Sequence, residues 1–139
     1  MAHASMLSGM ALANSGLGLA HGVAAALGVH CRAPHGLACA VMLPVAMRVN
    51  REVRASELAE LGRLFTGQAL TDEADAVEAA IETIETIGKR IGVPTRLSEI
   101  GVQGDQLPAL VTSSRGNSMS GNPRELSDEE LLDLLKGML

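Results

Sequence analysis

Residues 16–36 read GLGLAHGVAAALGVHCRAPHG and contain three of the four histidines of the chain, in a run otherwise made mainly of Gly, Ala, Leu and Val. Alanine and leucine lose little side-chain freedom in a helix, so we expect a helix over residues 19–27. Gly28 is a plausible end of that helix, and Pro34 stands where the next helix would begin, since the first turn needs no proline N–H. The stretch therefore predicts two apolar helices joined by a short loop.

The histidines of this stretch are candidate metal ligands. His21 lies inside the first expected helix, and His35 opens the second, fourteen residues further along. A tight helix-loop-helix turn would point both at one space, and neutral imidazole is a common ligand of zinc and iron. The alternative, that each is a core histidine donating one N–H to a carbonyl, stays open on spacing alone. We expect His30 in the exposed loop between them and His3 at a frayed end.

Helical periodicity continues through the rest of the chain, and no alternating strand pattern of useful length occurs. We expect a short, mostly buried helix over residues 1–13, and a bend or break at Pro44 inside the helix that His35 opens. The other expected helices cover residues 56–65, 71–91, 97–102, 104–114 and 127–139. The sequence therefore predicts an all-α fold, a helical bundle in a single domain over residues 1–139.

Three of these later helices have local signals. The helix over residues 56–65 has Leu58, Leu61, Leu64 and Phe65 on one side and is expected to cover the core. Thr71 is expected to cap the next helix, whose apolar stripe consists of Val77, Ile81, Ile84, Ile87 and Ile91. In the last helix, Ser127 and Glu130 have the spacing of a capping box, with Leu131, Leu132, Leu134 and Leu135 facing inward.

Composition excludes several classes of function. The 139 residues are 47% hydrophobic and 19% charged, with a net charge of -5, which argues against nucleic acid or an anionic membrane as a partner. No uninterrupted apolar run is long enough to cross a bilayer, and the N-terminus lacks a basic region typical of a signal peptide. Cys31 and Cys39 form no CxxC pair, so we expect neither a disulfide framework nor a thiolate zinc site. We expect the protein to reside in a reducing cytoplasm.

The first part of the chain is nearly uncharged. Arg32 and Arg48 are the only charged residues among the first 50, and the first acidic residue is Glu52. Helices that are apolar all round need cover, so we expect a second domain, a partner chain or a second copy to bury this surface.

The segment SGMALANSGLGLAHGVAAALGVHCRAPHGLACAVMLPVAMRVN, together with GNPRELSDEELLDLLKGML at the C-terminus, resembles the iron-containing (group III metal-dependent) alcohol dehydrogenases. The glycines before His21, the Pro34-His35-Gly36 turn, Pro44 and the sequence 122–124 (Asn-Pro-Arg) carry the resemblance. It implies the C-terminal helical domain of the dehydroquinate synthase-like fold, with the N-terminal Rossmann-like nucleotide-binding domain absent.

The resemblance also implies a site. His21 and His35 would ligate Fe²⁺ or Zn²⁺, and the family completes the metal shell with an aspartate and a histidine earlier in its sequence. Many members carry another histidine four residues after the first ligand, where this chain has Ala25. By position in the family, Leu12, Asn14, Ala25 and Ser118 are candidates for the wall of the substrate and cofactor cleft.

Two functional hypotheses follow. The first is the metal- and substrate-side domain of an NAD(P)-dependent alcohol dehydrogenase, inactive as the isolated chain because no NAD(P) turn is present in it. The second is a free-standing helical module that binds a partner or assembles with itself, its metal ligands being vestigial. The uncharged surface rich in Ala, Gly and Met at residues 1–47 motivates the second, since flexible methionines adapt to a partner.

Overall fold

The structure is a computed structural model that describes residues 1–139, and it contains helices and no strand. The α-helices are α1 (Ala2–Ser15), α2 (Leu19–Cys31), α3 (His35–Asn50), α4 (Ala55–Thr66), α5 (Glu73–Arg90), α6 (Leu107–Ser114) and α7 (Asp128–Lys136). Three single-turn 3₁₀ helices complete the set, η1 (Ser98–Ile100), η2 (Gly104–Gln106) and η3 (Asn117–Met119). The prediction of an all-α fold is confirmed.

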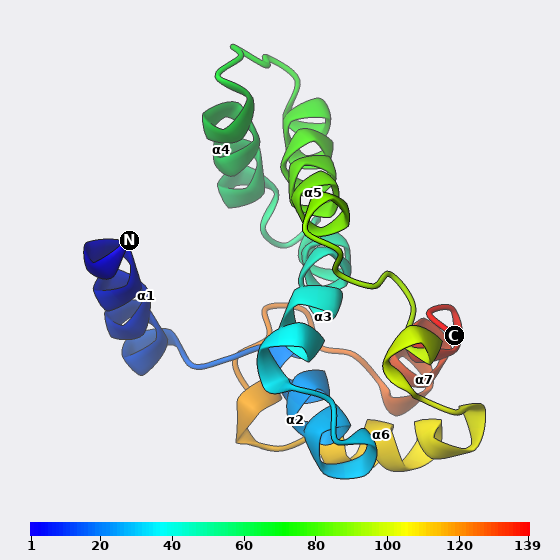
Figure 1. The fold of residues 1–139 in the computed structure, drawn as a ribbon. Coiled ribbons are helices and arrows are strands. Elements are labelled where there is room, and N and C mark those ends of the chain that lie inside the picture. Colours follow the sequence, from blue (N-terminus) through cyan, green and yellow to red (C-terminus); the bar gives the residue numbers. More distant parts are fainter.

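Helix α2 is the centre of the main core. Its apolar side chains, including Leu19, Val23 and Leu27, are fully buried, and they pack with residues of α3, α6 and α7 in one cluster of 19 buried residues. In Figure 1, α2, α6 and α7 lie together at the lower end of the molecule, with α3 rising from them. The C-terminal third of the chain therefore helps to cover the buried face of α2.

Glycines in and before α2 allow this close packing. A Cβ atom at Gly22 would stand 2.7 Å from the Met119 Cβ and 2.9 Å from the Ser114 carbonyl oxygen, closer than real Cβ contacts. A Cβ at Gly18 would stand 2.9 Å from the Asn122 Oδ1. Two of the glycines that precede or flank His21 are thus explained by contact with the segment near η3.

Helices α4 and α5 form a hairpin with a small core of its own, which projects away from α2 and α6 in Figure 1. The expectation that α4 covers the main core is wrong, because α4 packs against α5: Leu58 is buried, whereas Leu61, Leu64 and Phe65 are exposed. In α5 only the first part of the expected stripe, Val77 and Ile81, is buried, since α4 does not extend to Ile87 and Ile91.

The caps agree with the sequence in one helix and differ by one residue in another. The capping box at α7 is confirmed: the Ser127 hydroxyl accepts from the Glu130 N–H, and the Glu130 carboxylate accepts from the Ser127 N–H. Of the four leucines of α7, Leu131 and Leu135 are fully buried. Asp72, not Thr71, caps α5 by accepting the Asp75 N–H at 3.0 Å.

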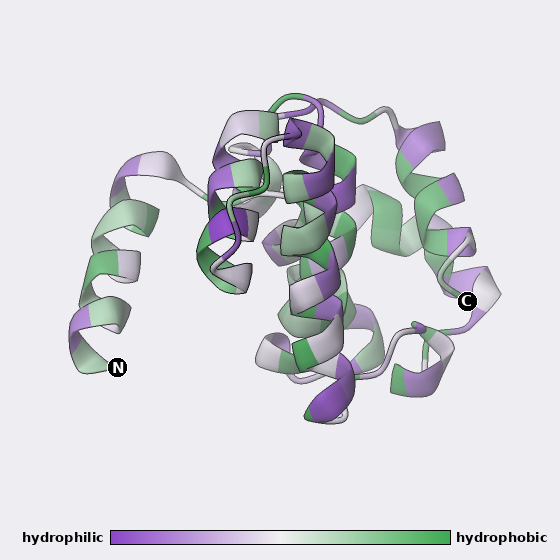
Figure 2. Ribbon diagram, turned by 90° about the horizontal axis from the view of Figure 1, so that it is seen from above, coloured by the Kyte–Doolittle hydropathy of each residue, from purple (hydrophilic) through white to green (hydrophobic).

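Helix α1 differs most from its prediction. It forms over the expected residues, but it is not buried: none of its residues is buried, and the helix stands apart from the rest of the molecule in Figures 1 and 2. The reason is that no other part of the 139 residues packs against it. Figure 2 shows mainly hydrophobic and neutral colours along its length.

Two helix boundaries also differ. α2 runs past Gly28 to Cys31 and is ended by Arg32, which adopts the left-handed conformation (φ 54°), so His30 lies in the last turn of a helix and not in a loop. α3 continues through Pro44 without the expected break, because buried residues before it and Asn50 after it hold both halves of the helix in place. His3 lies in the first turn of α1 and is exposed.

No helix is by itself long and apolar enough to cross a membrane; α1 and α2 reach that length and composition only as a pair, bent by 93°.

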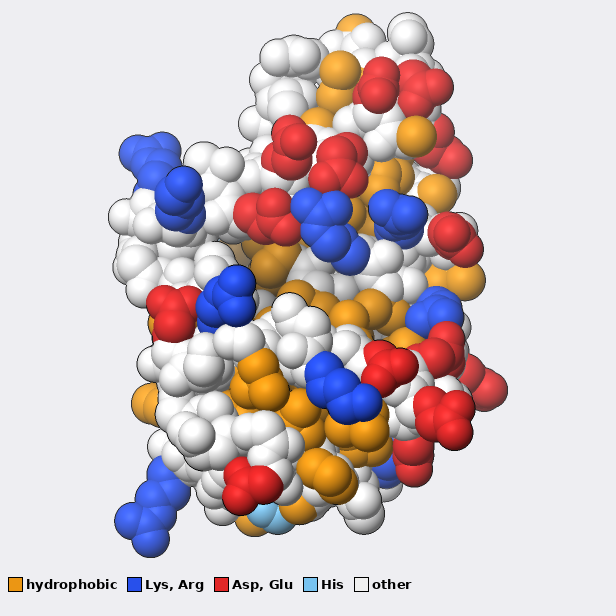
Figure 3. Space-filling view, turned by 90° about the vertical axis from the view of Figure 1, so that its right-hand side faces the viewer, with side chains coloured by type: hydrophobic (Ala, Val, Ile, Leu, Met, Phe, Trp, Pro, Cys, Tyr) orange, Lys and Arg blue, Asp and Glu red, His pale blue; other side chains and the backbone are white.

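Charged residues on the surface are of mixed sign. Figure 3 shows acidic and basic side chains interspersed over one face. Among them, Arg48 of α3 pairs with Glu78 and Glu85 of α5, at 2.9 Å each, and so ties the hairpin to the body.

Candidate metal site

The two histidines of the sequence motif lie at the junction of α2 and α3. His21 is in the first turn of α2 and is half-buried, and His35 is the first residue of α3 and is exposed. The left-handed Arg32 turns the chain after α2, and Pro34 stands at the N-cap of α3. This short connection sets the two helices side by side.

The imidazole rings meet directly. The His21 Nδ1 and the His35 Nε2 are 3.2 Å apart, and the ring centroids are 5.3 Å apart with an interplanar angle of 39°. Neither ring donates to a backbone carbonyl, which is the bond that a core histidine would make. The structure therefore brings together two nitrogen atoms that are able to face one metal ion.

Cys39 completes a triangle with the two histidines. Its Sγ lies 3.5 Å from the His21 Nδ1 and 3.5 Å from the His35 Nε2, and the three ligand atoms form a compact group. Burial raises the pKa of the Cys39 thiol. From the sequence alone, no metal site that includes Cys39 is expected, because Cys39 forms no CxxC pair with Cys31. The available signal was its position four residues after His35, which places both side chains on one face of a helix.

The donors fit a divalent transition metal. Tetrahedral coordination with bonds of about 2.0–2.1 Å to nitrogen separates two imidazole nitrogens by about 3.3–3.4 Å. The observed 3.2 Å between the His21 and His35 nitrogens is close to that separation. Imidazole is a ligand of both zinc and iron, so these two residues fit either ion.

The other predicted site residues lie in different surroundings. Leu12 and Asn14 are on α1, which stands apart from the body, and the Asn14 amide donates to the Met10 carbonyl of its own helix. Ala25 is exposed on α2, one turn after His21, and Ser118 is half-buried in η3. The structure thus gathers His21 and His35 but not the proposed cleft residues of α1.

His30 is outside the cluster. Its Nε2 lies 2.7 Å from the Ser113 hydroxyl of α6, so its ring joins α2 to α6 on the exposed surface. This residue therefore serves as a natural control for the histidines of the cluster.

The C-terminal Asn-Pro-Arg segment supports the helix that carries His21. The Asn122 Oδ1 accepts the Leu19 N–H at the start of α2 (3.0 Å) and a hydrogen bond from the Asn50 amide (3.1 Å). The Asn122 amide donates to the Arg124 carbonyl and to the Asn50 Oδ1. Arg124 in turn pairs with Glu130 of α7. Asn122 thus joins the beginning of α2, the end of α3 and the approach to α7.

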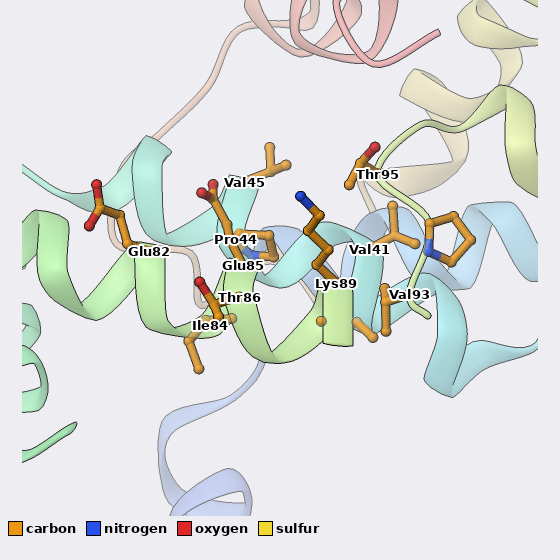
Figure 4. A pocket seen from close by; sticks show the side chains of 13 residues that line it. Val41, Pro44, Val45, Glu82, Ile84, Glu85, Thr86, Lys89, Val93 and Thr95 are labelled. Carbon is orange, nitrogen blue, oxygen red and sulfur yellow. The ribbon is translucent and has the colours of Figure 1, made fainter. Parts of the chain in front are cut away.

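A groove lies between α3 and α5, away from the cluster of His21, His35 and Cys39. This groove of about 570 Å³ is lined by residues such as Pro44, Val45, Ile84 and Lys89 (Figure 4). None of the three residues of the cluster lines it. The groove and the candidate metal site are therefore separate features of α3.

Comparison with known proteins agrees with the fold and the motif. The sequence pattern of the "Fe-containing alcohol dehydrogenase family, C-terminal" matches residues 1–139. Lactaldehyde reductase of Escherichia coli K12 is 33% identical over 139 residues, with 96% of this chain and 36% of that protein covered. 1,3-Propanediol dehydrogenase of Klebsiella pneumoniae is 36% identical over 140 residues, with 98% and 36% covered. A crystal structure of 1,3-propanediol oxidoreductase superimposes with a TM-score of 0.91 at 32% identity, covering 99% of this chain and 37% of that one.

The chain belongs to the iron-containing alcohol dehydrogenase family and corresponds to its C-terminal domain. It spans about a third of the length of the curated relatives it matches, 36% of each of the two described above. The resemblance inferred from the sequence motifs is confirmed.

Proposed function

We propose that this chain is the metal-binding, substrate-side part of an NAD(P)-dependent oxidoreductase that interconverts small alcohols and aldehydes. The observation that supports this best is the pair of imidazole nitrogens 3.2 Å apart at the α2–α3 junction, in a chain of this family. The names of the relatives, which include a lactaldehyde reductase and a 1,3-propanediol dehydrogenase, support a small hydroxylated or carbonyl substrate.

In this proposal, His21 and His35 hold Fe²⁺ or Zn²⁺. The chemistry supplied there is polarisation of the oxygen atom of an alcohol or aldehyde. The protein's own contribution is rigid placement: α2 is anchored by its buried face and by Asn122, and α3 begins at His35 itself. The remaining ligands and the NAD(P) site belong to a nucleotide-binding part outside these residues, so the 139-residue chain does not turn over alone.

We also propose that α2, the helix that carries His21, forms part of the substrate-binding side of the site. Ala25 lies four residues after His21 and presents only a methyl group, which leaves space beside the metal and supplies no proton relay. We place Leu12, Asn14 and Ser118 at the wall of the same cleft in the complete enzyme. Leu12 and Asn14 lie on α1, which packs against no other part of the 139 residues, so in this proposal another part of the enzyme covers α1.

Metal binding by the chain tests this function. Equilibrium dialysis under anaerobic, reducing conditions would measure Zn²⁺ and Fe²⁺ in the wild-type chain and in His21→Ala, His35→Ala and His30→Ala. We expect about one metal per chain in the wild type and the His30 control, weaker than in a complete site, and none in the other two variants. Unchanged uptake in His21→Ala and His35→Ala would overturn the assignment of these two residues as ligands. Robust NAD-dependent alcohol oxidation by the 139-residue chain would overturn the proposal that this chain is inactive alone.

A second candidate function is association through α1. The observation in its favour is that exposed apolar side chains, Met6, Leu7, Met10 and Leu12, are spread around a helix without a buried residue. Such an apolar surface binds another polypeptide or a second copy, so we propose a homo-oligomer for the chain. Light scattering over a wide concentration range tests it, and a clean monomer throughout would contradict it.

The cellular setting is part of the proposal. Cys31 and Cys39 are unpaired thiols, and Cys39 faces the two histidines, where oxidation would block a metal. Thiols persist in reducing compartments. We therefore place the protein in the cytoplasm, and fractionation of source cells would check this.

A further inference from the structure

We propose that Cys39 is a third metal ligand, so that this chain alone presents two imidazoles and one thiolate to a thiophilic divalent ion such as Zn²⁺. The inference rests on the proposed function only because it shares His21 and His35. It adds a ligand from α3 that the two-histidine motif does not contain, and it predicts which metal the chain prefers.

The distances within the cluster support a common centre. Bonds of about 2.0–2.1 Å to nitrogen and about 2.3 Å to sulfur, at tetrahedral angles, separate a sulfur from a nitrogen by about 3.5–3.6 Å. The Cys39 Sγ lies 3.5 Å from the His21 nitrogen and 3.5 Å from the His35 nitrogen. With 3.2 Å between the nitrogens, the three atoms form one nearly equilateral face of a tetrahedron.

The three side chains come from rigid elements. His35 and Cys39 are one turn apart on α3, and His21 is held by α2, which packs against α3. Cysteine has one side-chain torsion and histidine two, so little freedom is lost when such a site forms. Ligands on packed helices keep their geometry better than ligands on loops. In the isolated chain, a water molecule would occupy the fourth position of a tetrahedral site.

The chemistry of the donors selects the ion. Thiolate is a soft ligand that favours zinc over divalent iron, and zinc also exceeds iron in the general order of affinities for nitrogen and sulfur sites. His21 and His35 alone can bind either ion. Cys39 therefore shifts the preference of this chain towards zinc.

The second cysteine of the chain provides a matched control. Cys31 is also half-buried, but its thiol lies 3.6 Å from the Gln106 side-chain oxygen and belongs to no cluster of histidines. Cys31→Ser and Cys39→Ser thus remove the same atom from two comparable environments. Only the second removes a donor from the triangle.

The test is titration of the reduced 139-residue chain with Co²⁺ as a spectroscopic substitute for Zn²⁺, followed by competition with Zn²⁺. We expect a thiolate-to-cobalt charge-transfer band and intense visible bands of tetrahedral type in the wild type and in Cys31→Ser. Cys39→Ser should lose the charge-transfer band. Its Zn²⁺ affinity should fall more than about 100-fold, since loss of outer-shell partners already costs roughly 10- to 100-fold. Circular dichroism of each variant checks that the fold is kept.

The outcomes separate this inference from the proposed function. Cobalt binding without a charge-transfer band, and with equal affinity in Cys39→Ser, would overturn the third ligand and leave the two-histidine site intact. Loss of the band in Cys31→Ser instead would also overturn it. No cobalt binding by the folded wild-type chain would overturn both. A Fe²⁺ affinity equal to that for Zn²⁺ would contradict the predicted preference.

Discussion

Helices α1 and α2 are both apolar, both rich in alanine, and both free of acidic residues, lysine and arginine, yet they have opposite environments. Six residues of α2 are buried, whereas α1 has none. The difference lies in their partners: α3, α6 and η3 surround α2, and nothing covers α1. Local sequence thus determines that a helix forms, while its burial depends on a complementary surface.

The largest expected effect is on the core of α2. Leu27 is fully buried, so Leu27→Ala should lower the free energy of unfolding by about 2–5 kcal/mol. Leu12 is the matched position on α1 and is 44% exposed. Leu12→Ala should change the free energy of unfolding by less than about 0.5 kcal/mol. Denaturant titration of both variants measures the contrast; equal losses would show that α1 is packed in solution.

Glycine substitutions sharpen the same contrast. Gly22→Ala puts a methyl group against Met119 and the Ser114 carbonyl and should destabilise the chain by about 1–3 kcal/mol. Nothing lies within 4 Å of a Cβ atom at Gly9, so Gly9→Ala should raise the helicity of α1, by about 0.5–1 kcal/mol in helix stability. Thermal unfolding followed by circular dichroism distinguishes them. Opposite signs are expected, and a stabilising Gly22→Ala would disprove the close contact.

An asparagine pair extends the comparison to hydrogen bonds. Asn122→Ala removes the partner of the Leu19 N–H and of the Asn50 amide and should cost about 2 kcal/mol, because part-buried groups lose their bonds. Asn14 bonds only within α1, on the exposed surface. Asn14→Ala should therefore leave unfolding nearly unchanged. A neutral Asn122→Ala would refute the role of this residue in anchoring α2.

The smallest predicted effect is a pH dependence of α7. The Ser127 N–H and then the Arg124 side chain bond to the Glu130 carboxylate and lower its pKa below the ordinary value of 4.5. Since the folded pKa is the lower one, the added stability is present above pH 4.5 and is lost as pH falls through the folded value. The difference between wild type and Glu130→Gln should therefore shrink on acidification. A difference that grows on acidification would contradict the sign.

Much of the fold could be predicted from local residues. The Ser127–Glu130 capping box, the helix opened by Pro34 and His35, and the short helical pieces near 97–114 depend on neighbours in sequence, and all appear. The exposure of α1 and the separate core of the α4–α5 hairpin could not be predicted in the same way. Both depend on which surfaces lie opposite Met6 or Leu64, and periodicity does not contain that information.

The candidate site was predicted in part. His21 and His35 were singled out by the motif, and the structure sets them together through a left-handed Arg32 that no sequence rule required. Cys39 was missed as a member of the cluster because a cysteine outside a CxxC pair gives a weak signal. Its spacing from His35 becomes informative only once α2 brings His21 to the same face of α3.

We propose above that the α2–α3 junction binds a metal through its own side chains. X-ray absorption spectroscopy of the zinc-loaded chain tests it most directly, because it counts ligands by type. We expect two imidazoles at about 2.0–2.1 Å and one sulfur at about 2.3 Å. A shell of oxygen atoms alone, without imidazole scattering, would contradict it.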